Sequence, residues 1–312
     1  MTIVLALLTS ALWGFADFGA GLLSRRMASA RVVVLSQAAA ALVLAVVVAA
    51  TGAYDEAGPR LWFAVGAGIV GPVALLCFYE ALARGPMGVV SPLASAGVII
   101  PVTVGLAVHG DRPGLLQYAG ILVAVVGIAL AGGPRLGGAA VHRSTLLLTL
   151  GAALGFGTVF ALIAEASTNV TGLFLALFVQ RVVNVGSGGA LLLLTERRGR
   201  ARAAAGPPHG TAEEPPSNTP TANGASTRPA WARMPAKLVL ALTVVGVADV
   251  AANGTYSTAA RLGPVTVAAV LASLYPVVTA LAAHGILKER LQAAQALGAG
   301  LALAGTVLLA AG

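Results

Sequence analysis

The sequence predicts an all-α polytopic membrane protein with ten transmembrane helices arranged as two inverted five-helix repeats. Composition is the first observation behind this prediction. Hydrophobic residues make up 58% of the chain and charged residues 10%, whereas a soluble domain carries about 25% charged residues. Apolar runs long enough to cross about 30 Å of hydrocarbon recur along the chain. A segment of the first half also recurs in the second half.

Ten apolar runs have spanning length, and they lie at 3–23, 32–51, 61–83, 87–108, 115–132, 144–164, 172–194, 237–259, 264–284 and 291–311. Each run is rich in Leu, Val and Ala on every side, whereas strands of a membrane barrel are shorter and alternate polar with apolar residues. We therefore expect helices. The first run follows no basic segment and is long enough to span, so we expect a retained helix and no cleaved signal peptide.

The strongest internal similarity joins residues 78–133 to residues 256–311. Leu93-Ala94-Ser95, for example, recurs 178 positions later as Leu271-Ala272-Ser273. The first two spans of each half resemble each other more faintly. Self-similarity at a fixed shift indicates a duplicated structural unit.

This unit is expected to contain five spans, with one copy at 1–133 and the other at 144–312. An odd number of spans makes the second copy enter the membrane in the opposite sense. Secondary transporters commonly use such inverted repeats, with the substrate site between the copies near the midplane. A segment at 195–236, rich in Pro, Ser, Thr, Asn and Ala, interrupts the second copy, and we expect it to be a disordered loop. A spacer is the favoured role for it, and a regulatory segment is the alternative.

The excess of Lys and Arg, a net charge of +8, is interpreted as a topology signal. These residues lie in connections between spans, so no nucleic-acid partner is expected. Outside the long loop, eight of them follow odd-numbered spans and three follow even-numbered spans. The positive-inside rule then predicts that both termini lie outside. The single Cys77 lies in an apolar run, which provides no disulfide framework and no Cys-rich metal site.

Ionisable side chains inside the expected spans are the first candidates for a substrate site, because a charge at a helix centre costs about 2.5–3.5 kcal/mol. Trp13 and Asp17 are four residues apart and share one face of the first span. Asp249, Asn253 and Tyr256 share one face of the eighth span. We predict that these residues line a central cavity, where the carboxylates bind a substrate amine or take up a coupling proton. A structural ion pair is the alternative role for the two acids.

Further polar residues are assigned to the cavity or to the packing of the helices. Tyr79, Ser95 and Ser273 are additional cavity candidates, although a serine can instead bond back to its own helix. The seventh span carries three residues that we predict to be structural, with the arginine pairing one of the acids and the amides joining helices: Gln180, Arg181 and Asn184.

Three segments resemble the EamA-type drug/metabolite transporter superfamily. They are Leu12-Trp13-Gly14, then Phe78-Tyr79-Glu80-Ala81-Leu82 leading to Gly85-Pro86, and Lys288-Glu289-Arg290-Leu291 before Gln295 and Gly298. The similarity covers essentially the whole chain apart from 195–236. The resemblance implies a bacterial inner-membrane carrier, often an exporter of amino acids or related metabolites, with a cavity lined by spans 1, 3, 4, 6, 8 and 9. It also implies termini inside, opposite to the charge distribution of this chain.

We therefore expect a secondary-active carrier, an exporter of a small polar or amphipathic metabolite that is amino-acid-like or an amine. It would work by alternating access in the inner (plasma) membrane, with a proton as candidate coupling ion and no cofactor. We expect no enzymatic activity, because the sequence contains no Gly-x-Ser-x-Gly, His-Glu-x-x-His or ATP-binding loop motif. His109 and His284 would lie on opposite membrane faces and cannot share a metal. The alternatives are a non-transporting membrane scaffold and an intramembrane enzyme without a recognisable motif.

Overall fold

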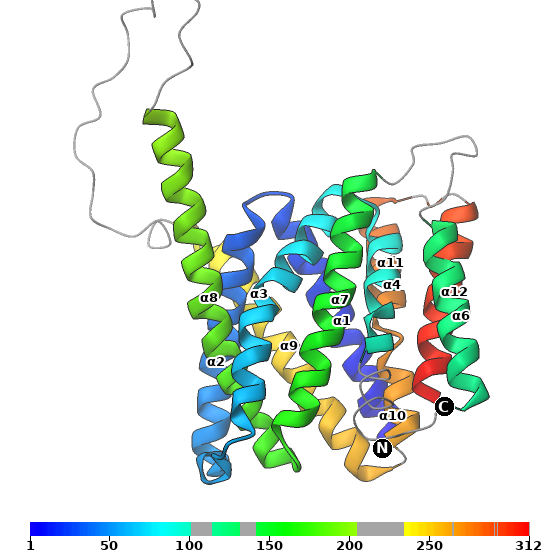
Figure 1. Ribbon diagram of the computed structural model, residues 1–312, viewed down its shortest axis with the longest axis horizontal. Helices are drawn as coiled ribbons and strands as arrows, with labels where there is room; N and C mark the ends of the chain where they lie inside the picture. Colours follow the sequence, from blue (N-terminus) through cyan, green and yellow to red (C-terminus); the bar gives the residue numbers. More distant parts are fainter. Residues whose placement is uncertain are drawn as a thin grey trace, which may run out of the picture.

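The structure is a computed structural model, and it describes residues 1–100, 114–131, 142–204, 234–263, 265–289, 291 and 293–311. Within these residues every regular element is a helix and no strand occurs (Figure 1). The α-helices are α1 (Thr2–Ser24), α2 (Ser29–Thr51), α3 (Leu61–Arg84), α4 (Met87–Ser95), α6 (Leu115–Ala131), α7 (Arg143–Ala166), α8 (Val170–Ala204), α9 (Ala236–Leu262), α10 (Val265–Ala272), α11 (Tyr275–Leu287) and α12 (Ala293–Ala311). Two short 3-10 helices, η1 (Ala53–Glu56) and η2 (Ala96–Val98), follow α2 and α4.

Six of the described helices are long and apolar enough to cross a membrane, namely α1, α2, α3, α7, α9 and the Val170–Arg197 part of α8. Three further apolar helices are shorter, at Leu115–Gly127, Tyr275–Leu287 and Ala293–Leu308. Large apolar side chains on the outside of the bundle are exposed, for example Leu42 at 72% and Leu147 at 68%. Extensive apolar cover of this kind marks a surface that contacts membrane or protein rather than water. The chain is an integral, multi-pass membrane protein.

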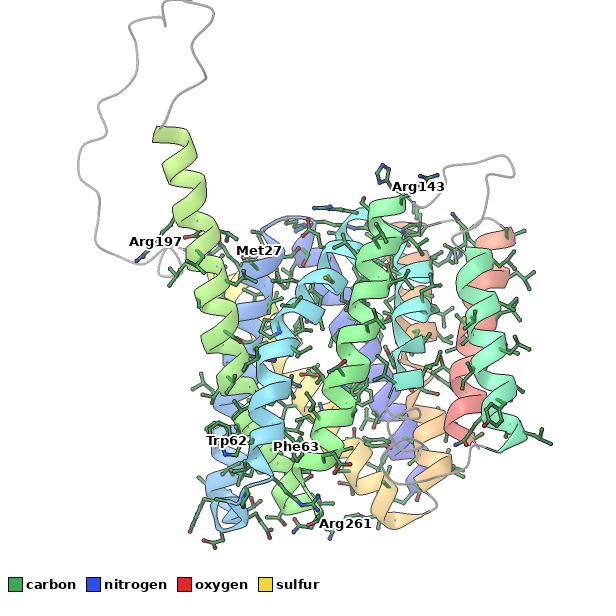
Figure 2. The ribbon with its side chains drawn as sticks, viewed as in Figure 1. Met27, Trp62, Phe63, Arg143, Arg197 and Arg261 are labelled. Carbon is green, nitrogen blue, oxygen red and sulfur yellow. The ribbon has the colours of Figure 1, made fainter. Side chains whose placement is uncertain are left out.

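The helices run between two ends of the bundle that differ in charge. Arg143 and Arg197 lie at one end, which we call the basic end, and Arg261 lies at the other (Figure 2). Both chain termini lie at the same end as Arg261, which we call the termini end (Figure 1). Helix α8 projects beyond the rest of the bundle at the basic end.

Two of the expected continuous spans are interrupted at equivalent positions of the sequence repeat. The expected span at 87–108 is α4 up to Ser95 followed by η2, and its part beyond residue 100 lies outside the described residues. The expected span at 264–284 is divided into α10 and α11 at Ser273 and Leu274. Pro276, near the start of α11, has no N–H to donate to the preceding turn, which accounts for this break.

The break between α10 and α11 is stabilised by a side chain from α1. The Ser10 hydroxyl donates to the backbone carbonyl of Leu271 and lies 3.0 Å from that of Ala272. Carbonyls freed by a helix break need such partners, because no water reaches them in the hydrocarbon region. Helix α1 is therefore hydrogen-bonded to the interrupted span at the α10–α11 break itself.

Close packing of α1 against α11 brings their aromatic residues together. A methyl group added at Gly14 would lie 2.5 Å from Cβ of Val278, so only glycine permits this approach. The Thr279 hydroxyl donates to the Gly14 carbonyl at 3.1 Å. Trp13 and Tyr275, the neighbours of these contacts, consequently face each other.

The structure differs from the sequence prediction over part of the segment expected to be disordered. Helix α8 continues through Ala204, so residues 195–204 are helical. This stretch is rich in Arg and Ala, which are strong helix formers and extend the helix beyond its apolar part. An ion pair between Arg31 and Glu196, at 3.0 Å, attaches the extension to the start of α2. The remaining 205–233 part of the expected loop lies outside the described residues.

Candidate functional site: a central cavity

A cavity of about 600 Å³ lies among the helices of both halves of the chain. Its lining comes from α1, α2, α3, α7, α8, α9, the α10–α11 break and α12. The walls are mostly apolar and carry a few polar side chains, which is the usual composition of a small-molecule site. The polar and aromatic lining residues include Trp13, Asp17, Gln37, Tyr79, Phe156, Phe160, Gln180, Arg181, Asp249, Asn253, Tyr256, Ser257, Ser273, Tyr275 and Thr306.

Asp249 is held from two sides in the cavity wall. Arg181 Nη2 donates to Asp249 Oδ2 at 2.6 Å, and Trp13 Nε1 donates to Asp249 Oδ1 at 3.2 Å. The arginine side chain is 10% exposed and the aspartate side chain 24%. An ion pair shielded to this degree must be hydrogen-bonded to offset the cost of desolvation, and these contacts supply those bonds. The charge of Asp249 is thus neutralised within the protein.

A chain of amides continues from the ion pair into the bundle. Gln37 Oε1 accepts from Arg181 Nη1 at 3.0 Å and from Asn184 Nδ2 at 3.0 Å. These contacts join α2 to α8, while the pair with Asp249 joins α8 to α9 and the Trp13 contact adds α1. The polar chain therefore fixes four helices around one side of the cavity.

Asp17 differs from Asp249 because its carboxylate has no partner among the described residues. It lines the cavity on α1, one turn beyond Trp13. No hydrogen bond or ion pair is found for it within the described part of the chain, and its electrostatic neighbours are Asp249 and the hydroxyls of Tyr79 and Tyr275. An unpaired acid surrounded by apolar and aromatic side chains is available to a ligand.

Aromatic rings form the wall next to the two acids. The rings of Trp13 and Tyr256 are 6.2 Å apart, centroid to centroid, with 36° between their planes. Trp13 and Tyr275 are 6.0 Å apart at 70°, an edge-to-face arrangement. Tyr79 on α3 and Phe156 on α7 add aromatic surface to the lining. These aromatic residues line the same cavity as Asp17.

The structure places the cavity candidates from the sequence in two kinds of position. Seven of the eight cavity candidates belong to the lining: Trp13, Asp17, Tyr79, Asp249, Asn253, Tyr256 and Ser273. Asn253 also donates to the backbone carbonyl of Asp249 at 2.7 Å. Ser95 is the exception, because it is buried between α4 and α12, where it donates to the Pro92 carbonyl at 2.8 Å and lies 3.3 Å from Thr306 Oγ1. Ser95 and Ser273 are equivalent in the sequence repeat, but only Ser273 belongs to the cavity lining. The repeat therefore did not predict the position of Ser95.

The residues assigned to structure occupy the wall and its support. Gln180 and Arg181 line the cavity, and Asn184 is fully buried behind them. Sequence reasoning missed Gln37 as a member of this group. Its signal was an amide in the middle of an otherwise apolar span, at the position that corresponds to Gln180. Tyr275 was missed as well, although it directly precedes the inner proline of the repeat.

The cavity extends toward the termini end of the bundle. Helix α7 begins at Arg143, at the basic end (Figure 2), and the lining includes Ser167, which follows the opposite end of that helix. Leu173, near the start of α8, belongs to the same part of the lining. Among the described lining residues none comes from the connections at the basic end.

Polar contacts join the two halves of the chain at the basic end. Arg25 Nη2 donates to Glu289 Oε1 at 2.8 Å, and Glu289 Oε2 accepts from the backbone N–H of Met87 at 2.9 Å. Arg25 also contacts the carbonyl of Gly85 at 3.3 Å. We call Arg25, Glu289 and the Met87 N–H the basic-end clamp. It joins the end of α1, the α3–α4 junction and the α11–α12 connection, and so crosses between the two halves of the chain.

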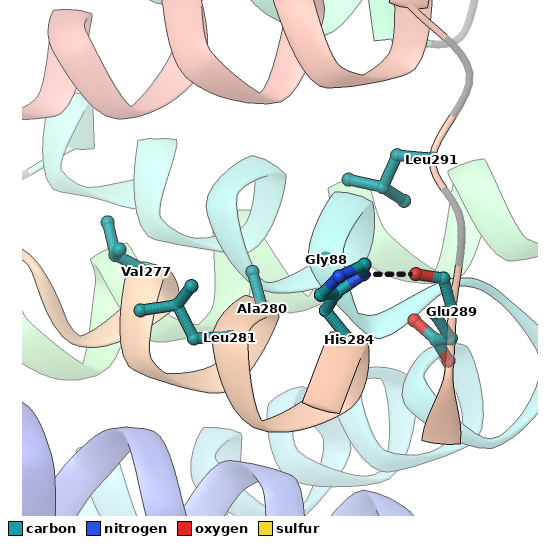
Figure 3. Close-up of a pocket in the computed structure, with 7 residues that line it drawn as sticks. All are labelled: Gly88, Val277, Ala280, Leu281, His284, Glu289 and Leu291. Atoms are coloured by element: carbon teal, nitrogen blue, oxygen red, sulfur yellow. Dashed lines mark hydrogen bonds between the residues drawn. The ribbon is translucent and has the colours of Figure 1, made fainter. Parts of the chain in front are cut away.

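Beside the clamp lies a second, separate hollow of about 520 Å³. Figure 3 shows its lining from α4, α11 and the α11–α12 connection. His284 Nδ1 donates to the backbone carbonyl of Glu289 at 2.8 Å in this view. The side chain of Leu281 on its rim is 65% exposed. The hollow shares no lining residue with the central cavity.

The EamA-like transporter family matches residues 1–133 and 220–311, so the chain belongs to this family. It is therefore a membrane transporter of the drug/metabolite transporter superfamily, as the sequence resemblance predicted. A solved crystal structure, described only as "Crystal structure of protein", is similar to the chain with a TM-score of 0.54 and 15% sequence identity. The similarity covers 98% of this chain and 95% of the other, and it shows a shared fold. The curated proteins contain no match to the sequence.

Proposed function

We propose that this protein is a secondary-active carrier, and not an enzyme, that exports a small polar or amphipathic metabolite, amino-acid-like or an amine. The observation that carries the proposal is the central cavity, which holds an unpaired carboxylate, extends toward one end of the bundle and is clamped at the other. A carrier needs a site that is accessible from one side at a time. The described arrangement matches one of the two states of such a cycle.

The proposed cycle uses ten spans arranged as two inverted repeats, and close contacts between helices support this arrangement. Gly68 on α3 packs against Val183 on α8, where an added methyl group would lie 2.5 Å from Cβ. Gly246 on α9, 178 positions later, packs in the same way against the backbone of Ser36 and Ala40 on α2. Each contact joins the third span of one half to the second span of the other.

A second pair of contacts, between α6 and α12, supports the same arrangement. A methyl group added at Gly127 would overlap the backbone nitrogen of Ala302, and one added at Gly305 would overlap that of Ala124. Gly305 and Ala302 lie 178 positions after Gly127 and Ala124. The two contacts thus exchange when the halves are exchanged, as a two-fold relation between the repeats requires. Small residues at such contacts let membrane helices approach closely.

The proposed direction of the described state rests on the charge distribution of the chain. The positive-inside rule places the basic end in the cytoplasm of a cell whose inner (plasma) membrane holds the protein. The cavity then extends toward the outside, and the basic-end clamp is the inner gate. Release of substrate to the outside from this state, and uptake of a proton by Asp17 for the return step, would give export coupled to the proton gradient.

The experiment that tests this proposal compares metabolites in cells and medium with and without the protein. The compared proteins are wild type, Asp17→Asn and a matched control, Asp55→Asn, whose carboxylate is exposed in η1 outside the cavity. The proposal predicts a compound that accumulates in the medium with wild type and with Asp55→Asn but not with Asp17→Asn. Equal export by all three proteins, at equal expression, contradicts the assignment of Asp17. A medium unchanged by wild type contradicts export.

A further inference from the structure

The charges of the central cavity restrict the kind of substrate that it can neutralise. Apart from tyrosines, the ionisable residues among its described lining are Asp17, Arg181 and Asp249. Arg181 and Asp249 are paired with each other at 2.6 Å. Asp17 is the remaining acid, and when it is ionised the described lining carries one net negative charge.

Among the described lining residues, a substrate carboxylate would find no cation without a counter-ion. The charge of Arg181 is already compensated, because its Nη2 pairs with Asp249 and its Nη1 donates to Gln37. A substrate carboxylate beside the arginine would share this one cation with Asp249, next to the Asp17 carboxylate. An unpaired charge in a low-dielectric site is strongly unfavourable. The geometry is thus unfavourable to zwitterions such as amino acids.

A substrate cation finds the opposite situation. Its charge can pair with Asp17, which interacts with Tyr275 and lies one turn beyond Trp13 on α1. The ring of Tyr256 is 6.2 Å from that of Trp13 in the same lining. Cations are attracted to aromatic faces, most strongly to tryptophan and more strongly when desolvated. The volume of about 600 Å³ also falls within the range of small-molecule sites, and the apolar walls suit an aromatic or alkyl body.

We propose that the central cavity takes a monovalent organic cation, an amine or quaternary ammonium with an aromatic or alkyl body and no carboxylate, and that Asp17 pairs with its charge. This inference rests on the proposed carrier function. It selects the amine from the two substrate types named there and rejects the amino-acid-like type.

Equilibrium binding to the purified full-length protein tests the inference with a matched pair of probes. Tryptamine and tryptophan share one ring system and differ by the carboxylate, and benzyltrimethylammonium adds a permanent cation that cannot lose a proton. Wild type should bind both cations and bind tryptophan about tenfold or more weakly than tryptamine. Asp17→Asn should weaken the binding of both cations by about tenfold or more, because the loss of an ion pair worth about 1.4 kcal/mol raises Kd by a factor of ten. Asp17→Glu should restore part of the loss, and Asp55→Asn should bind as wild type does.

Each other result overturns the inference in a recognisable way. Tryptophan bound as tightly as tryptamine, cations bound equally by Asp17→Asn, or no binding of either cation contradicts the substrate class. Flux of the probes in proteoliposomes then separates this inference from the proposed function. If the cations bind but are not transported, the proposed carrier function is contradicted and the proposed cation site stands. If tryptophan is transported and the cations are not, the carrier function stands and the proposed cation site is contradicted.

Discussion

Breaking the basic-end clamp should shift the protein toward a state that is open at the basic end. Glu289→Gln removes the ion pair with Arg25, whose side chain is 30% exposed while that of Glu289 is 16% exposed. Exposed ion pairs contribute about 0.2–1 kcal/mol. The change also replaces a charge-assisted hydrogen bond to the Met87 N–H by a neutral one, a loss of about 1 kcal/mol. The sum, about 1–2 kcal/mol, corresponds to a shift of roughly 5–30-fold in the equilibrium between the two states.

Thiol labelling measures this shift directly. Ser24→Cys, in a Cys77→Ala background, places a thiol at a buried position next to Arg25 with little change in shape. Its labelling by a membrane-impermeant reagent in inside-out vesicles should accelerate by roughly 5–30-fold when Glu289→Gln is added, in line with the shift of the equilibrium. Glu196→Gln is the matched control, since it breaks an ion pair with Arg31 at the same end, outside the clamp. Labelling that is unchanged by Glu289→Gln, or accelerated equally by Glu196→Gln, refutes the gate.

Three further predictions concern packing, the helix break and orientation. Gly305→Val should lower the melting temperature in detergent by several degrees because the added side chain collides with Ala124, whereas Gly300→Val, which has open space around it, should leave it unchanged. Equal melting temperatures for the two variants would contradict the close α6–α12 contact. Ser10→Ala should lower the free energy of unfolding by about 1–3 kcal/mol, because it removes the donor to the carbonyls at the α10–α11 break. Thr243→Ala, which removes a hydrogen bond within α9, should lower it far less. Chemical unfolding in detergent measures both free energies, and equal losses would show that the break needs no partner. A reporter fused to the C-terminus should register as outside the cell, and an inside signal would reverse the assignment from the charge distribution.

The membrane class and the helical architecture were predictable from the sequence because they depend on local composition. Long apolar runs without alternation leave only the helix as a spanning structure. The breaks at Ser95 and Ser273 were harder to predict from the sequence, since proline within a membrane helix is compatible with a kink, a hinge or a full interruption. The partner of the carbonyls at the α10–α11 break is Ser10, which is distant in sequence and gives no local signal.

The candidate site was predictable in its residues but not in their pairing. Asp17 and Asp249 both stand out as acids in apolar spans, and the sequence offers Arg181 equally to either of them. The choice of Asp249 follows from how α1, α8 and α9 pack, which no local pattern encodes. The helical extension of α8 to Ala204 shows the reverse case, in which the polar composition of a segment concealed a strong local helix propensity.

Counterflow in proteoliposomes tests the central claim most directly, because only a carrier exchanges internal for external substrate through one alternating site. Liposomes loaded with unlabelled tryptamine, containing wild type or Asp17→Asn in equal amounts, are diluted into labelled tryptamine. A transient accumulation of label with wild type, absent with Asp17→Asn and retained with Asp55→Asn, is the predicted result. Label that enters equally with wild type and Asp17→Asn would contradict the role of Asp17, and label that enters no faster than in protein-free liposomes would contradict carriage of this cation through the cavity.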